Sequence, residues 1–249
     1  MSDAQEQSIG ASVTSAAVFG ASGGIGHALV KELADRGVDR IYAGSRSGNA
    51  PGGETIIPFR FDYEDPASIE ATANIMAEHP PQLVIVATGV LTLPDGTGPE
   101  RSYKQLDGVT MARVLQANTI GPALVAKAML PLFDRKQRSV FAALSARVGS
   151  IGDNGIGGWH SYRASKAALN MLVKNFAIEL GRTHKQAVLA SLHPGTVDTA
   201  LSEPFQSNLP DGQLTGAQEA ARNLLSVIEG LTPEQSGHQF DWKGERVPD

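Results

Sequence analysis

Tyr162 and Lys166 stand four positions apart, and their side-chain types suit acid–base chemistry. The run from Ser161 to Gly181 predicts a helix, on which this spacing puts both side chains on one face, about one turn apart. A phenol has an ordinary pKa of ~10, and a neighbouring ammonium lowers that pKa by favouring the phenolate. Such a tyrosine can give a proton to a carbonyl oxygen or take one from an alcohol. The alternative is a tyrosine that merely packs beside a surface lysine.

The segment Gly20-Ala21-Ser22-Gly23-Gly24-Ile25-Gly26 joins an apolar run to a predicted helix. At such a junction, backbone N–H groups and the positive end of the helix dipole attract a diphosphate. Glycines are needed there because side chains would block its approach. We therefore expect a dinucleotide cofactor to be held by Gly20, Ser22, Gly23, Gly24, Ile25 and Gly26. A tight turn without a ligand is the alternative, since 27 glycines are spread along the chain.

Arg46 follows the second predicted strand, in the position that meets the adenosine ribose of a dinucleotide. An acid there suits NAD, whereas an arginine suits the 2′-phosphate of NADP. The run from Ala43 to Ser47 holds no acid, and the planar Arg46 fork can bind a phosphate. The pattern therefore predicts NADP, against the alternative of a solvated loop arginine. Asp62, which ends the third strand, is expected to bond the adenine amino group or to cap the next helix.

Short apolar runs alternate with helical stretches along the chain. Strands are predicted at residues 16–19, 40–45, 55–61, 83–88, 139–145, 187–193 and 237–242, and helices at 25–36, 66–78, 106–133, 161–181 and 217–229. Continuous apolar strands between helices are typical of a parallel sheet that is covered on both faces. We expect a doubly wound, Rossmann-type α/β fold with three α/β/α layers. It would form a single domain over residues 15–249, after a flexible leader at residues 1–14.

Composition excludes several classes of protein. The formal net charge of -5 gives no reason to expect a nucleic-acid partner. No apolar run is long enough to span a bilayer, and the polar start lacks the Lys or Arg of a signal peptide. The absence of cysteine excludes disulfides and permits a reducing compartment. We therefore expect a cytoplasmic protein that binds no membrane. The six histidines show no metal-ligand spacing, so no metal site is predicted.

Four motifs occur in the order and spacing of the short-chain dehydrogenase/reductase family. They are Gly20-x-x-x-Gly24-x-Gly26, Asn118-x-x-Gly121-Pro122, Tyr162-x-x-x-Lys166 and Pro194-Gly195-x-x-x-Thr199. The chain resembles this family from about Ala17 to Trp242. The stretch from Gly157 to Asn170 also resembles the subgroup of C-factor-like and sniffer-like carbonyl reductases. The resemblance implies hydride transfer between NADP(H) and a small carbonyl or alcohol substrate, and assembly into a homodimer or homotetramer.

The resemblance also implies roles for residues beyond the Tyr–Lys pair. Asn118 would hold a water that links Lys166 to solvent, unless it is simply a helix-kink residue before Pro122. Lys166 would also bond the nicotinamide ribose, and Thr199 would bind the carboxamide. Further cofactor contacts are expected from Thr88, Gly89, Pro194, Gly195 and Val197. A largely apolar pocket for a ketone, aldehyde or quinone is expected from Trp159, Leu201 and Phe205.

Two positions depart from the family pattern. The run from Val86 to Gly89 replaces the usual Asn-Asn-Ala-Gly, and Ala146 stands where the family has its active-site serine. That serine polarises the substrate oxygen, and loss of one such donor costs ~3 kcal/mol, or about two orders of magnitude in rate. We expect Ser145 to substitute, with Ser150 as the alternative. Strand alternation argues against Ser145, although a bulge at the strand end would turn its side chain.

Two other functions remain open from the sequence. The first is an NADP-binding sensor or signalling module with little turnover, which Ala146 favours. The second is a sugar-nucleotide epimerase or dehydratase, which also uses Tyr-x-x-x-Lys. The short region after Thr199 leaves little material for a sugar-nucleotide domain.

Overall fold

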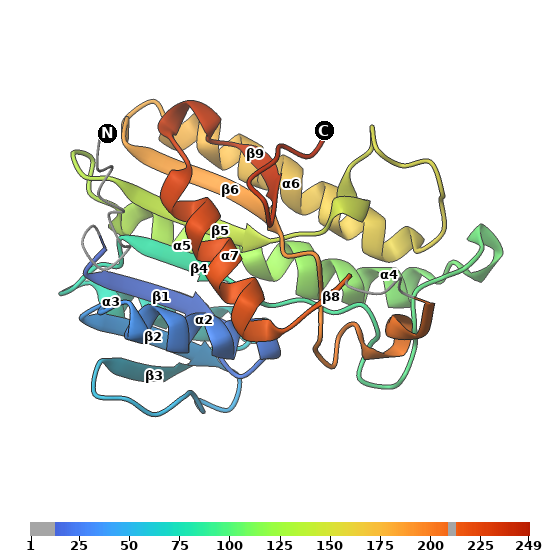
Figure 1. The fold of residues 1–249 in the computed structure, drawn as a ribbon, viewed down its shortest axis with the longest axis horizontal. Helices are drawn as coiled ribbons and strands as arrows, with labels where there is room; N and C mark the ends of the chain where they lie inside the picture. The colour runs from blue at the N-terminus through green and yellow to red at the C-terminus, as the bar shows by residue number, and fades with distance from the viewer. Residues whose placement is uncertain (1–12, 209–212) are drawn as a thin grey trace, which may run out of the picture.

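The centre of the molecule is a seven-stranded parallel sheet in the order β3-β2-β1-β4-β5-β6-β9 (Figure 1). The computed structural model describes residues 13–208 and 213–249. The strands of the sheet are β1 (Ser15–Phe19), β2 (Arg40–Ser45), β3 (Ile56–Arg60), β4 (Leu83–Val86), β5 (Ser139–Leu144), β6 (Ala187–His193) and β9 (His238–Asp241). Two short strands, β7 (Thr196–Val197) and β8 (Leu214–Thr215), pair with each other outside it. The predicted doubly wound α/β fold is confirmed.

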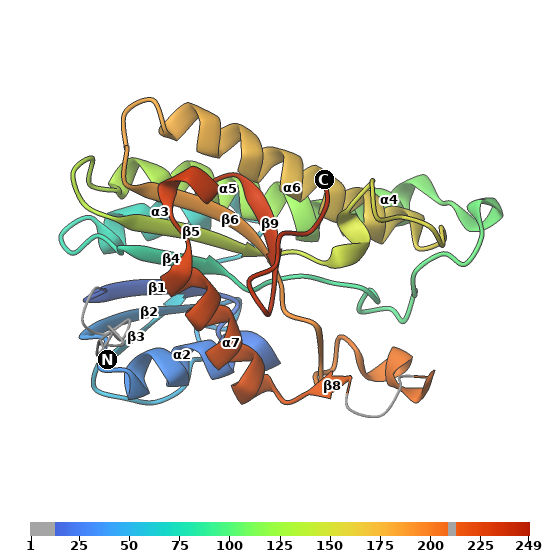
Figure 2. The ribbon, with the colours of Figure 1, turned by 45° about the horizontal axis from the view of Figure 1, so that its top comes forward.

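Helices cover both faces of the sheet, which explains why its strands are apolar throughout. The helices are α2 (Gly24–Asp35), α3 (Pro66–Met76), α4 (Gly108–Leu115), α5 (Gly121–Met129), α6 (His160–Leu180) and α7 (Ala217–Gly230). Figure 2 shows α2 and α7 on one face and α3, α5 and α6 on the other. Short helical turns lie at η1 (Tyr103–Gln105), η3 (Leu130–Leu132), η4 (Arg147–Gly149), η5 (Glu203–Asn208) and η6 (Pro233–Gln235), and a π turn at η2 (Gln116–Ile120).

Side chains of β5 alternate between two hydrophobic cores. Val140, Ala142 and Leu144 pack in the core under α2 and α7, whereas Phe141 and Ala143 pack in the core under α5 and α6. This alternation is the ordinary period of two along a strand. It fixes the face on which each residue near the end of β5 must lie.

The strand order reverses at β1, which pairs with β2 on one side and with β4 on the other. The chain therefore crosses to opposite faces of the sheet after these neighbouring strands. In open α/β sheets the crevice at the carboxyl ends of such strands is the usual place for a ligand. The glycine turn lies at this point, between β1 and α2.

The helical stretch predicted at residues 106–133 is observed from Gly108 to Leu132, as four consecutive helical segments. Its central part, η2, is a π turn, and Pro122 lies in the first turn of α5 that follows. Pro122 has no N–H, so the carbonyl of Asn118, four residues earlier, loses its regular helical partner. The prediction of a long helical stretch that contains Pro122 and Pro131 therefore agrees with the structure, in which the π turn accommodates Pro122 without ending the helix.

The leader predicted at residues 1–14 lies outside the described residues except for Val13 and Thr14. Val13 is buried, and Thr14 bonds the Gln82 side chain through both its backbone N–H and its hydroxyl. In the part of the chain that the structure describes, none of the helices has the length and apolar character needed to cross a membrane.

Candidate active site

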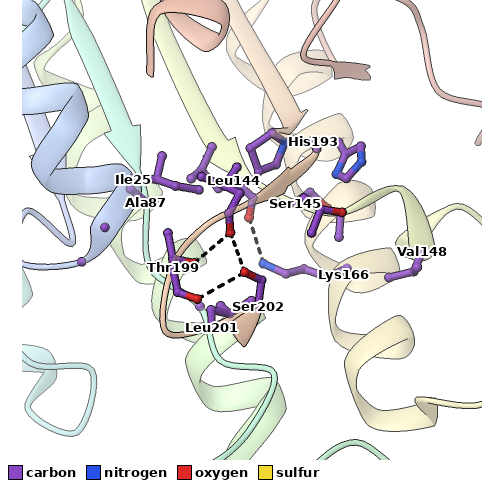
Figure 3. Close-up of a pocket in the computed structure, with 18 of the residues that line it drawn as sticks. Ile25, Ala87, Leu144, Ser145, Val148, Lys166, His193, Thr199, Leu201 and Ser202 are labelled. Atoms are coloured by element: carbon purple, nitrogen blue, oxygen red, sulfur yellow. Dashed lines mark hydrogen bonds between the residues drawn. The ribbon is translucent and has the colours of Figure 1, made fainter. Parts of the chain in front are cut away.

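A pocket of about 550 Å³ lies at the carboxyl ends of the parallel strands (Figure 3). The glycine turn before α2, the segments after β4, β5 and β6, and the start of α6 form its walls. It is lined by most of the predicted site residues, namely Gly23, Gly24, Ile25, Thr88, Gly89, Ser145, Tyr162, Lys166, Pro194, Gly195, Val197 and Thr199. Trp159, Leu201 and Phe205, expected around the substrate, also line it. Gly20, Ser22, Gly26, Arg46, Asp62 and Asn118 lie outside its lining.

Tyr162 and Lys166 reach the pocket from the first two turns of α6. The Lys166 Nζ lies 5.8 Å from the centroid of the Tyr162 ring. It donates a hydrogen bond of 2.9 Å to the carbonyl oxygen of Leu144, at the end of β5. Both side chains are buried. The pair thus shares one pocket with the glycine turn.

Burial sets the pKa of both groups. It raises the pKa of Tyr162 to about 12, because the phenolate is poorly solvated there. It also lowers the pKa of Lys166 to about 8, because the ammonium is desolvated. The net shift of the tyrosine pKa is therefore opposite in direction to the lowering expected from Lys166, because desolvation of the phenolate dominates. At neutral pH Tyr162 is a phenol, which is the form that donates a proton.

Glu100 holds the beginning of α6 through a contact with Ser161 that no local sequence pattern predicted. Its buried carboxylate accepts hydrogen bonds from the backbone N–H and the hydroxyl of Ser161. A carboxylate at this end of a helix is also favoured by the helix dipole. Its carbonyl oxygen accepts a 2.5 Å bond from the N–H of Trp159. Glu100 therefore holds the turn that precedes Tyr162.

Trp159 adopts a left-handed backbone conformation, with φ 51° and ψ 42°. A bulky side chain rarely tolerates this conformation, so the surrounding contacts must hold it. The indole meets the Phe205 ring at 5.2 Å and the Tyr162 ring at 6.3 Å, both edge to face. Trp159 thereby joins the η5 segment to the start of α6 on one apolar side of the pocket.

Asn118 is fully buried behind the pocket and connects three segments of chain. Its side chain bonds both backbone groups of Val90, at 2.8 Å and 2.9 Å, and the hydroxyl of Ser165 at 3.1 Å. These contacts occupy both the carbonyl and the amide group. The expected water link to Lys166 would therefore have to use a group other than this side-chain amide.

The glycine turn before α2 is closed by backbone contacts. Gly20 has φ +103°, and the Gly23 N–H donates to its carbonyl at 3.0 Å. A Cβ on Gly26 would lie 2.1 Å from that same carbonyl oxygen, so only glycine fits. Gly24 faces Thr199, whose methyl carbon would be 2.6 Å from an added Cβ. The turn is thus packed against the segment after β6.

Arg46 and Asp62 lie beyond the pocket, at the ends of β2 and β3. Arg46 is exposed, and its carbonyl accepts a bond of 3.1 Å from the Nε of Arg60. The Asp62 carboxylate accepts a bond from the Glu64 N–H at 3.0 Å. The N-cap residue of α3 is Asp65 rather than Asp62. Asp62 therefore forms a turn of its own, and the capping alternative does not hold.

The three candidates for the active-site hydroxyl differ in position. Ala146, in the family's serine position, is half-buried and lines the pocket. Ser145 contributes to the wall, but its Oγ is buried and has no partner among the described residues. Alternation along β5 places that Oγ on the α6 side. Ser150 does not line the pocket, and its Oγ accepts a bond of 3.0 Å from the Asp153 N–H.

His193 is a pocket residue that the sequence interpretation set aside. It ends β6, pairs in register with Asp241 of β9 and lines the pocket wall. Burial lowers its pKa to about 4, against the opposing effect of Asp241, so the imidazole is neutral at ordinary pH. Within residues 13–208 and 213–249, no three His, Asp or Glu side chains are grouped so as to hold a metal ion.

Comparisons with known proteins agree with this geometry. The family model for short chain dehydrogenases matches residues 14–210. A 1-hydroxy-2-glutathionyl-2-methyl-3-butene dehydrogenase from Rhodococcus sp. (strain AD45) is 36% identical over 88% of this chain and 92% of its own length. C-signal of Myxococcus xanthus is 40% identical over 57% of this chain and 81% of its own length. The chain therefore belongs to the short-chain dehydrogenase/reductase family.

Solved structures show the same fold. The NADPH-bound carbonyl reductase from chicken fatty liver superposes with a TM-score of 0.79 at 26% identity, covering 96% of this chain and all of that one. The carbonyl reductase Sniffer of Drosophila melanogaster superposes with a TM-score of 0.81 at 21% identity, covering 95% of this chain and 99% of its own. The sequence resemblance to the family is confirmed, and the similarity to C-signal agrees with the resemblance to C-factor-like members. The chain is an oxidoreductase.

Proposed function

We propose that this protein transfers a hydride between NADP(H) and a carbonyl or alcohol substrate, with Tyr162 as the acid–base group. The observation that carries the proposal is that Tyr162 and Lys166 line the same pocket as the glycine turn. A phenol that shares a pocket with a dinucleotide turn can protonate a carbonyl oxygen while the carbon is reduced.

The described residues fit a bound dinucleotide. No side chain caps the N-terminus of α2, and Gly24 and Ile25 of its first turn line the pocket. These N–H groups would bind the diphosphate. Arg46 would bind the 2′-phosphate, and the carbonyl reductase from chicken fatty liver supports this choice because it was solved with NADPH. Bound NADPH supplies the hydride.

The residues around the pocket would hold the phenolic proton and transfer it to the substrate oxygen. Tyr162 holds the phenolic proton at neutral pH because its pKa is raised to about 12. Lys166 is fixed to the end of β5 through Leu144, beside the tyrosine ring. Its ammonium would stabilise the phenolate as the proton leaves. Asn118 would keep the Val90 segment and α6 in register, so that this pair faces the cofactor.

The other two functions lack comparable support. The family assignment and the dehydrogenase relative favour turnover over a sensor role. The short-chain dehydrogenase model likewise does not favour an epimerase or dehydratase. The apolar side of the pocket, built by Trp159, Leu201 and Phe205, supports an apolar ketone, aldehyde or quinone as substrate.

NADPH consumption with a panel of such carbonyl compounds tests the proposal. We expect NADPH oxidation that depends on the carbonyl compound, and tight NADPH binding measured separately by fluorescence titration. NADPH binding without turnover of any carbonyl or alcohol would refute the enzymatic function and leave the sensor.

We also propose a homodimer or homotetramer in the cytoplasm. Large apolar side chains are exposed on neighbouring helices, with Val109 on α4, Ile120 at η2, and Met171 and Ile178 on α6. Met171 and Ile178 are seven residues apart and so share one helix face. Sedimentation equilibrium of the purified chain tests the assembly.

A further inference from the structure

Ala146 leaves the wall after β5 without the hydroxyl expected there. Its backbone is extended, with φ −147° and ψ 147°, and the residue is half-buried at the pocket wall. Extended backbone suits serine as well as alanine, and this residue is the N-cap of η4, a position that serine favours. The local conformation therefore does not require alanine at this position.

The neighbouring serines do not replace the missing group. The Ser145 Oγ is buried on the α6 side, and the Ser150 Oγ accepts the N–H of Asp153 away from the pocket. The wall after β5 thus presents no accessible hydroxyl among the described residues.

Other polar side chains around the pocket are already engaged. The Thr88 Oγ1 is 2.6 Å from the Tyr63 hydroxyl. Both Thr199 and Ser202 donate to the carbonyl oxygen of Val197, at 3.4 Å and 2.5 Å. Arg147 is bound by Asp153 through Nε and Nη2. His193, Thr196 and the indole N–H of Trp159 remain, and none of the three belongs to the wall after β5.

We propose that this pocket polarises a substrate carbonyl with a single hydrogen bond, from Tyr162, and therefore acts on electron-poor carbonyl compounds. The inference rests on the proposed function and narrows its substrate class. In the reduction, the carbonyl carbon accepts the hydride of NADPH and the C=O π pair moves to the oxygen. That oxygen takes the Tyr162 proton, which solvent later restores, and the products are an alcohol and NADP⁺.

Negative charge gathers on the substrate oxygen during this step. Removal of one preorganised donor from such an oxygen typically costs ~10²–10³-fold in kcat. A substrate that carries electron-withdrawing groups spreads this charge itself and needs less help. An unactivated ketone lacks that help, so it would react slowly here.

Ring-substituted acetophenones, from 4-methoxy to 4-nitro, test the proposal because they differ in electron demand and little in shape near the carbonyl. We expect kcat/KM of the wild type to rise steeply with electron withdrawal. Ala146→Ser should raise kcat for 4-methoxyacetophenone ~10–100-fold, with a smaller gain for the 4-nitro compound. A plot of log(kcat/KM) against the electron-withdrawing strength of the substituent should therefore have a smaller slope for Ala146→Ser than for the wild type. KM and the NADPH affinity from fluorescence titration should stay close to wild type.

Ala67→Ser is the matched control, because it adds the same hydroxyl to an exposed residue of α3 that lies outside the pocket. It should leave the slope of log(kcat/KM) against electron withdrawal unchanged.

A shallow slope of this plot in the wild type would overturn the inference, since a second donor such as His193 or Thr196 would already act. An Ala146→Ser variant with wild-type kcat for 4-methoxyacetophenone would overturn it too. So would a tenfold loss of kcat in Ser145→Ala, because that loss would show that the Ser145 hydroxyl contacts the substrate. Failure of every variant to reduce these compounds and every other member of the carbonyl panel, with NADPH still bound, would instead refute the proposed function.

Discussion

Lys166 reaches from α6 to the end of β5, where its Nζ donates a 2.9 Å hydrogen bond to the carbonyl oxygen of Leu144. This contact ties the catalytic helix to the central sheet through a buried ammonium. It places a titratable cation beside the Tyr162 ring. Both the chemistry and the stability of the protein should therefore depend on the charge of Lys166.

Replacement of Tyr162 by phenylalanine removes the proposed proton donor and little else. We expect kcat for carbonyl reduction to fall ~10²–10⁴-fold, with NADPH affinity and the thermal midpoint close to wild type. Steady-state kinetics and fluorescence titration measure the two effects. Tyr103→Phe is the control, since Tyr103 is 68% exposed and lies in η1. A Tyr162→Phe enzyme with wild-type kcat would contradict the assignment.

The rate of reduction should show an alkaline limb due to Lys166. Its pKa of about 8 means that the ammonium is present below that pH and lost above it. Tyr162 stays protonated across this range because its pKa is about 12. We expect kcat/KM to fall above about pH 8 in the wild type. Lys166→Arg should move this limb to higher pH, because arginine keeps its charge. A limb at the same pH in that variant would assign it to another group.

Stability should also change with pH in a direction set by the same two groups. The folded-state pKa of Lys166 lies below its ordinary value of 10.5, so from about pH 8 to 10.5 the unfolded chain binds more protons and stability rises. The pKa of Tyr162 is raised from 10.0 to about 12, so its stabilising contribution is full below about pH 10 and is lost from about pH 10 to 12. Thermal midpoints from pH 7 to 10 should rise relative to those of Lys166→Met. Parallel curves for the two proteins would contradict the buried ammonium.

Arg46 should decide the preference between the two nicotinamide cofactors. Loss of a hydrogen bond to a charged group costs ~1.5–3 kcal/mol, so Arg46→Ala should weaken NADPH binding by roughly 10- to 150-fold. NADH binding should change little. Fluorescence titration of both cofactors measures this, with the exposed Arg135→Ala as a charge-matched control. Equal affinities of the wild type for NADPH and NADH would show that Arg46 does not read the 2′-phosphate.

Two glycines of the same turn should respond differently to alanine. A Cβ on Gly26 would meet the Gly20 carbonyl oxygen at 2.1 Å, whereas one on Gly23 would meet it at 3.4 Å. Gly26→Ala should therefore cost ~1–3 kcal/mol in the free energy of unfolding, and Gly23→Ala much less. Chemical denaturation measures both values. Equal losses would mean that the turn relaxes more freely than this geometry allows.

The sheet and the shared helix face of Tyr162 and Lys166 could be predicted because their signals are local. Apolar runs marked each strand, and a spacing of four put Tyr162 and Lys166 on one helix face. The direction of the Tyr162 pKa shift could not be predicted, because it depends on burial by segments distant in the chain. Glu100 was missed for the same reason, since its partner Ser161 is 61 residues away.

The orientation of the Ser145 side chain could be predicted only in part from the sequence. Alternation along the strand argued that its side chain would turn away from the pocket, and the two cores of β5 follow that alternation. Selecting Ser145 as the replacement hydroxyl required a bulge that the strand does not contain. His193 gave no signal of its own, because a histidine before a Pro-Gly turn is equally compatible with a surface position.

Because of the π turn at η2, the position of Asn118 depends on the exact number of residues in the helical region from Gly108 to Leu132. Removing one residue from Gln116–Ile120 would restore a regular helix and rotate every later side chain by about 100°. Asn118 could then no longer meet both backbone groups of Val90 and the hydroxyl of Ser165. Homologous chains that keep this asparagine should therefore tolerate insertions in surface loops but not deletions here, and a chimaera joined within this turn should misalign α6 against the sheet.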